Sequence, residues 1–107
     1  MYRITFYVPQ THLETTKQAL FNVGVGKIAP YDHCCWQTLG TGQFRPLQES
    51  NPSLGQKNKI CIEPEYKVEM VCDDSLILIA LETLLKQHPY EKPAYEAYKI
   101  ITLDDLE

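Results

Sequence analysis

The 107-residue sequence predicts an α+β fold with the element order βαββαβ, in which two helices cover one face of a four-stranded antiparallel sheet. Three observations lead to this prediction. Stretches at the start, the middle and the end of the chain alternate between apolar and polar residues, which is the period of half-buried strands. Two stretches between them have helical spacing and end at Gly or Pro. The length suits one hydrophobic core and is too short for two, so we expect a single domain over residues 1–107.

The first strand is expected over residues 2–8, where apolar residues occupy every second position, and Pro9 ends it. Thr11 followed by Glu14 predicts a capping box at the start of the first helix. An apolar stripe then continues to Gly24, where the helix is expected to end.

The segment CCWQTL, residues 34–39, is expected to form the second strand. The next residues, about 41–59, contain Gly, Pro and Asn and show no sustained period, so we expect a long loop. A compact domain seldom keeps so long a loop without a use for it, which directs attention to this segment as a functional region.

The segment KICIEPEYKVEMVC, residues 59–72, has the alternation of a third strand, and Pro64 predicts a bulge or an edge position within it. Asp73, Asp74 and Ser75 predict a cap for the second helix, SLILIALETLLKQ, which Pro89 ends. The segment AYEAYKIITL, residues 94–103, is the expected last strand, and the acidic tail is expected to fray.

This order is the split βαβ, or ferredoxin-like, arrangement, and right-handed crossovers leave few alternatives to it. On the face that the helices do not cover, we expect Tyr7, Val71, Tyr95 and Ile101. These side chains are too apolar for a fully hydrated surface, so we expect a homo-oligomer that forms through the sheet or its edges.

Composition and charge narrow the possible partners. The formal charge is −4 and no basic cluster occurs, so nucleic acid is not an expected partner. The longest apolar run, residues 76–81, is far shorter than a bilayer span, and the N-terminus lacks the features of a signal peptide. The four cysteines form no C-x-x-C pair. We therefore expect a cytoplasmic protein with reduced thiols and no membrane partner.

Metal binding is one hypothesis for the dense segment around His33, Cys34 and Cys35, because imidazole and thiolate groups bind zinc and copper. Adjacent residues of a strand point to opposite faces, so the two cysteines cannot easily hold one ion together. A divalent metal would instead need distant partners such as His88, Glu91 or Cys61. The first choice combines His33 with His88 or Glu91 across a strand pair or a subunit boundary. The alternative interpretation is that the cysteines are small buried hydrophobes.

Catalysis has less support, since no G-x-S-x-G, phosphate-binding or dinucleotide-binding motif is present, and we do not expect independent enzymatic activity. The Gly40-Thr41-Gly42 run could present backbone N–H groups to an anion beside Arg45. In the structural alternative, these glycines only permit turns, and Phe44 holds the loop against the body.

Two segments together resemble a known family: YDHCCWQTLGTGQFRPLQESNPSLG and HPYEKPAYEAY. They are similar to the YqfO-type domain of the NGG-interacting-factor-three-like family, a small domain inserted into a larger di-metal protein. The pattern H-P-Y-E-x-P also resembles CutA, the divalent-cation-tolerance protein, which shares a trimeric ferredoxin-like fold with PII signalling proteins. The family's di-metal domain does not fit within this sequence, so its GTP cyclohydrolase label is not expected to apply.

The resemblance implies a non-enzymatic, oligomeric module of the PII/CutA type that senses a small molecule or ion or docks on another protein. A trimer is the first choice for the oligomer and a dimer is the second. The alternatives are a metal-binding protein related to divalent-cation tolerance and an accessory fragment of a metal-dependent hydrolase. We expect the two motifs to meet in space, where Arg45 can approach Glu91 or an anion. The resemblance implies ligand or interface roles for His33, Gly40, Gly42, Phe44, Arg45 and Tyr90. The possible metal ligands are His33, His88 and Glu91.

Overall fold

The computed structural model describes residues 1–107 and has the predicted α+β architecture. The strands are β1 (Tyr2–Val8), β2 (Trp36–Phe44), β3 (Cys61–Cys72) and β4 (Tyr95–Lys99), and the helices are α1 (Gln10–Asn22) and α2 (Ile77–Gln87). Short 3₁₀ helices span Asp74–Leu76 and Leu103–Leu106. The element order βαββαβ and the ferredoxin-like fold class are therefore confirmed.

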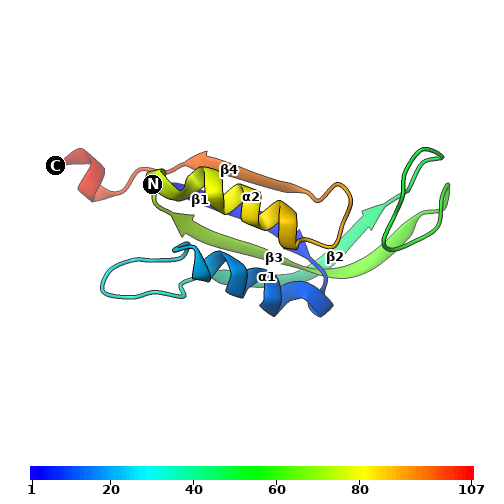
Figure 1. Ribbon diagram of the computed structural model, residues 1–107, viewed down its shortest axis with the longest axis horizontal. Helices are drawn as coiled ribbons and strands as arrows, with labels where there is room; N and C mark the ends of the chain where they lie inside the picture. The colour runs from blue at the N-terminus through cyan, green and yellow to red at the C-terminus, as the bar shows by residue number, and fades with distance from the viewer.

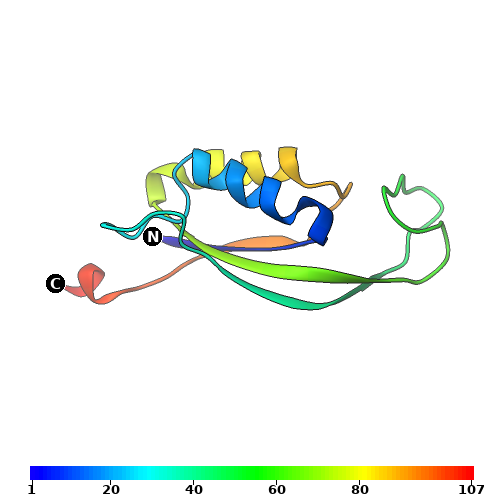
Figure 2. The same cartoon turned by 90° about the horizontal axis from the view of Figure 1, so that it is seen from below.

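The four strands form one antiparallel sheet in the order β2-β3-β1-β4, so β2 and β4 are its two edges. Both helices lie on one face of this sheet (Figure 2). Ile4 in β1 is opposite Met70 in β3 and Ala97 in β4. Because directly opposed residues share a face, this register places the apolar alternation of β1 and β3 under the helices.

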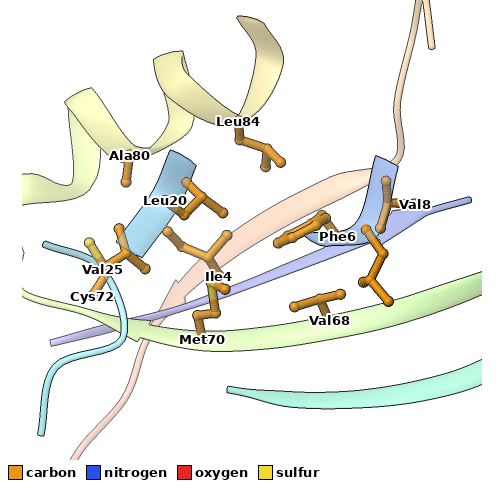
Figure 3. Close-up of a cluster of buried hydrophobic side chains, with 11 residues drawn as sticks. Ile4, Phe6, Val8, Leu20, Val25, Val68, Met70, Cys72, Ala80 and Leu84 are labelled. Atoms are coloured by element: carbon orange, nitrogen blue, oxygen red, sulfur yellow. The ribbon is translucent and has the colours of Figure 1, made fainter. Parts of the chain in front are cut away.

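The core fills the space between the sheet and the two helices (Figure 3). Burial of apolar side chains stabilises the folded state by about 25 cal/mol per Å² of surface removed from water. In this chain, most of the buried apolar side chains lie in this layer. Its fully or nearly fully buried members are Ile4, Phe6, Val8, Leu13, Leu20, Val25, Val68, Met70, Cys72, Ala80 and Leu84.

The loop expected over residues 41–59 starts later than predicted, because β2 continues to Phe44 and pairs residue by residue with β3 from Trp36↔Glu69 to Phe44↔Cys61. The irregular segment is 45–60, and both Gly40 and Gly42 belong to a strand. Pro64 forms no bulge. The β1 ladder ends at Val8↔Tyr66, so Pro64 has only β2 beside it and occupies an edge position.

The expected capping box of the first helix is wrong. α1 begins at Gln10 directly after Pro9, which places Thr11 inside the first turn, and Glu14 pairs with Lys17 at 3.1 Å. Before the second helix, Asp73 caps the 3₁₀ helix Asp74–Leu76 and accepts a hydrogen bond from the Ser75 N–H at 2.9 Å, whereas α2 itself begins after Leu76 without a side-chain cap. β4 ends at Lys99, and the tail that was expected to fray forms a 3₁₀ turn capped by Thr102 and Asp105.

The open face of the sheet is more polar than the sequence predicts. Tyr7 and Val71 lie on it, but Tyr95 is opposite Phe6 and therefore shares the helix-covered face, and Ile101 lies beyond the end of β4. Charged residues of β1, β3 and β4 fill much of the open face: Arg3, Lys67, Glu69 and Glu96. Alternation alone did not show which face Tyr95 would occupy, since that depends on the register against β1.

The molecule is elongated, with extents of 52 × 22 × 21 Å. The β2–β3 hairpin extends beyond β1 and β4 and ends in the 45–60 loop (Figure 1). Segment 88–94, between α2 and β4, lies toward the same end of the molecule, whereas segment 23–35 lies toward the other (Figure 1). Neither helix is long and apolar enough to cross a membrane.

Candidate functional site

A groove of about 890 Å³ lies where the β2–β3 hairpin, the first part of its loop and the segment after α2 meet. Residues 38–47 and 50–54 form one side of it, and residues 90–94 form the other. Tyr7, Glu65, Lys67 and Glu69 contribute from β1 and β3. Segments that are 40 residues apart in the sequence therefore build one concavity.

Two glycines of β2 form part of its floor. Gly40 and Gly42 are opposite Glu65 and Glu63, which places both glycines on the open face of the sheet. A Cβ atom added at Gly40 would meet nothing within 4 Å, whereas one added at Gly42 would collide with the carboxylate of Glu65. The Glu65 side chain therefore leans over Gly42, and the space above Gly40 is open.

Tyr90 forms part of the opposite wall. Its ring lies 5.9 Å from that of Phe44, measured between centroids, so the end of β2 contacts the segment after α2. The Tyr90 hydroxyl is buried and lies close to the Glu65 carboxylate. Burial first, and the nearby Glu65 carboxylate second, raise the pKa of Tyr90, so this phenol stays protonated and can donate a hydrogen bond.

His88 holds this wall against β1. It is the C-cap residue of α2 and is only 7% exposed. Its Nε2 donates to the Tyr7 carbonyl at 2.5 Å, and its Nδ1 accepts from the Tyr90 N–H at 3.1 Å. This pattern requires the neutral ring, and burial lowers the His88 pKa accordingly. Both ring nitrogens are already occupied, so His88 is a brace and not a free metal ligand.

Glu91 connects segment 88–94 to the 45–60 loop, because its Oε1 accepts a hydrogen bond from the Asn51 N–H at 2.9 Å. Arg45 forms no ion pair with Glu91, and the alternative, an anion bound at Arg45, stays a prediction. Arg45 does line the groove, together with Gly40, Gly42, Phe44 and Tyr90, so the structure brings together most of the residues singled out from the sequence.

His33 is the exception, and the two motifs meet only in part. Its ring packs on Phe21 at 4.6 Å between centroids, and its Nδ1 lies 3.1 Å from the Asp32 carboxylate, in the segment at the far end of the molecule. The chain therefore does not assemble His33 with His88 and Glu91 into one metal site. No group of three or more His, Cys, Asp or Glu residues is placed to hold a metal ion.

Charged residues of β3 belong to the groove but were not singled out from the sequence. Glu65, Lys67 and Glu69 alternate along one face of the strand. In the sequence, such alternation is typical of a strand face that is exposed to solvent. Only the pairing of β3 with the glycines of β2 shows that these side chains border an open space.

No family model matches the chain. Curated relatives called GTP cyclohydrolase 1 type 2 homolog match most of it: 32% identity over 94% of this chain in Halalkalibacterium halodurans, 33% over 92% in Bacillus subtilis and 36% over 94% in Listeria innocua. The chain spans about a quarter of the length of these relatives, namely 27%, 26% and 27%.

Solved structures agree with these relatives. A Bacillus cereus protein related to NIF3 superimposes with a TM-score of 0.80 and 29% identity, over 94% of this chain and 26% of that chain. CutA from Pyrococcus horikoshii gives 0.70 with 16% identity, over 99% and 92%, and Bacillus subtilis GlnK in complex with ATP gives 0.60 with 13% identity, over 94% and 82%. The last two likenesses show the fold alone. The chain is therefore homologous to one segment of the NIF3-related proteins and has the CutA/PII-like ferredoxin fold, as the two sequence motifs predicted.

Proposed function

We propose that the chain is a non-enzymatic binding module of the PII/CutA type, and that the groove between the β2–β3 hairpin and segment 90–94 holds its small-molecule ligand. The observation that carries the proposal is Gly40. Glycine inside a strand costs about 0.5–1 kcal/mol relative to Ala. A strand glycine usually marks a bulge, a bend or the close approach of a ligand or another backbone.

At Gly40 the structural explanations fail one after another. Its φ is not positive, the β2–β3 ladder continues through it without a bulge, and no atom lies near the position that a Cβ would take. The close approach of a group that is not part of the chain would explain this glycine, and we assign that group to a ligand. A groove of about 890 Å³ that combines aromatic, aliphatic and charged side chains is of the size and kind that small ligands use.

We also propose that the protein acts in the cytoplasm as a homo-oligomer, with a trimer as the first choice and a dimer as the second. β2 is an edge strand, and all of its residues except Gly42 and Phe44 are exposed. Exposed apolar residues accompany it on the hairpin, namely Trp36, Leu39 and Ile62. A long uncovered edge of this kind invites pairing with another strand. The other edge, β4, is available on a second copy, and repeated β2-to-β4 contacts would close into a ring.

The ligand proposal is tested by filling the space above Gly40. Val at this position suits a strand and meets no atom of the chain at its Cβ, so Gly40→Val should leave thermal stability unchanged or slightly higher. A thermal-shift screen of small metabolites should give compounds that stabilise the wild-type protein and do not stabilise Gly40→Val.

The control is Gln37→Val, on the same strand but on the opposite face and outside the groove. It should respond to the same compounds as the wild type. If every stabilising compound acts equally on Gly40→Val, the groove is not the binding site and the proposal is wrong.

A further inference from the structure

We propose that the ligand of this groove is a small zwitterion of the amino-acid kind, whose ammonium group binds at Glu65 and Tyr90 and whose carboxylate binds at Lys67. This inference rests on the proposed function and names the chemical class of its ligand.

The charges along the groove are balanced and unpaired. Its lining contains three carboxylates, on Glu65, Glu69 and Glu91, and three cations, on Arg45, Lys67 and Lys92. None of the six belongs to an ion pair within 4.0 Å. A ligand with a single charge would satisfy one sign and leave residues of the other sign partly desolvated without a partner, which costs free energy. A ligand with both charges avoids this cost.

The Glu65 side chain is turned away from Lys67, the other central charge of the groove. Glu65 and Lys67 are two residues apart on the same face of β3, or about 6.6 Å along the strand at 3.3 Å per residue. Glu65 leans over Gly42, which lies beside Glu63 in the ladder and thus on the side away from Lys67. The open space above Gly40 lies between the two charged side chains, because Gly40 is opposite Glu65, and Thr38, opposite Lys67, is the next residue on that face. One small molecule there can reach both.

The Glu65 end of the groove offers what an ammonium group needs. The buried Tyr90 hydroxyl lies beside the Glu65 carboxylate, so its proton can turn to Glu65 while its oxygen accepts a hydrogen bond from the ammonium group. The rings of Phe44 and Tyr90 flank this end, and aromatic rings attract cations. Leu47 and Leu54 from the loop provide an apolar surface for the rest of the ligand.

Three probes that share a phenyl ring separate the two charges: phenylalanine carries both, phenethylamine carries only the ammonium group, and 3-phenylpropionate carries only the carboxylate. Titration calorimetry on the full chain at pH 7.5 should show phenylalanine binding at least about tenfold more tightly than either single-charge probe, since hydrogen bonds to charged groups contribute about 1.5–3 kcal/mol. Gly40→Val should abolish the binding of all three.

Two neutralising variants should then act on different probes. Glu65→Gln should weaken phenylalanine and phenethylamine about tenfold or more and leave 3-phenylpropionate unchanged. Lys67→Gln should weaken phenylalanine and 3-phenylpropionate by a similar factor and leave phenethylamine unchanged. Circular dichroism of each variant checks that the fold is retained.

Absence of phenylalanine binding, equal affinity for the single-charge probes, or variants that affect all three probes alike would each overturn the zwitterion assignment. Such a result is separate from failure of the binding function itself. If a compound of another class stabilises the wild type but not Gly40→Val, the groove is a ligand site for a different chemistry.

Discussion

Residues of one type have different tasks in this chain, and their surroundings decide which. His33 lies in an exposed segment and stacks on Phe21, whereas His88 is buried and uses both ring nitrogens to join β1 to the groove wall. Gly40 and Gly42 share a strand face, but Gly42 leaves room for the Glu65 carboxylate and Gly40 leaves open space. The role of each residue follows from what lies within a few ångströms of it.

Protonation of His88 should destabilise the fold as the pH falls. Burial lowers the folded-state pKa of His88 below its ordinary value of 6.5, so the unfolded chain binds this proton more readily than the folded one. The free energy of unfolding should therefore be constant above about pH 6.5, decrease below it, and level off for this group once the folded-state pKa is passed. Urea unfolding at intervals from pH 7.5 to pH 5 measures this slope.

The matched variants are His88→Gln, which should remove the slope, and His33→Gln at the exposed histidine, which should retain it. The lowered pKa values of Asp73 and Asp74 affect stability only in more acidic solution, below their ordinary value of 3.8, and do not overlap this range. An unchanged slope in His88→Gln would assign the pH dependence to another group.

Each element of the fold is stabilised by the burial of one of its faces, and α2 shows this clearly. Ala80 and Leu84 are fully buried against the sheet and α1, while Leu78, Ile79 and Leu85 on the same helix are largely exposed. The helix is apolar over most of its circumference, so its composition alone does not identify the side that packs.

Adjacent leucines of α2 provide a test of this packing. Leu84→Ala should lower the free energy of unfolding by about 2–5 kcal/mol, because it leaves a cavity in the core. Leu85→Ala, at a position that is 43% exposed, should lower it by about 0.5 kcal/mol or less. The helix propensity change is the same in both variants, so the difference between their urea unfolding curves, at equal protein concentration, measures burial alone.

At the scale of the whole molecule, the hairpin arm dominates the shape. The second half of β2 and the first half of β3 extend past the two-helix layer; most side chains of β2 are exposed, and those of Cys61–Tyr66 are exposed or half-buried. The helices do not cover this arm, so it lacks the packing contacts that they give to the rest of the sheet. Contacts with a neighbouring subunit would supply them, which is why the oligomer is proposed through the sheet edges and not through the polar open face.

Light scattering at micromolar concentration should therefore give a mass three times, or as the second choice twice, the 12.3 kDa of one chain. Trp36→Lys adds a charge at an exposed aromatic residue of β2 and should shift the mass toward that of the monomer. Leu78→Lys, at a similarly exposed residue of α2, should leave the mass unchanged. A wild-type mass of 12.3 kDa would show that the arm is not an interface.

About half of the candidate site could be predicted from the sequence. The density of Gly, aromatic and Arg residues in residues 40–45 and around Tyr90 was visible as two motifs, and these residues line the groove. His33 belonged to the first motif but not to the groove, because β2 runs the length of the sheet and carries its two ends far apart. Nearness in sequence becomes distance in space along an extended strand.

The sequence by itself determined the elements, since a period of two or of 3.6 residues is a local property of the chain that neighbouring residues reveal. The tertiary structure alone decided the pairing register, and through it which faces meet. The register placed Tyr95 under the helices, extended β2 through Thr41–Phe44, and set Glu65 and Lys67 beside the open backbone of Gly40. Register depends on contacts between segments far apart in the chain, so no local pattern could show it.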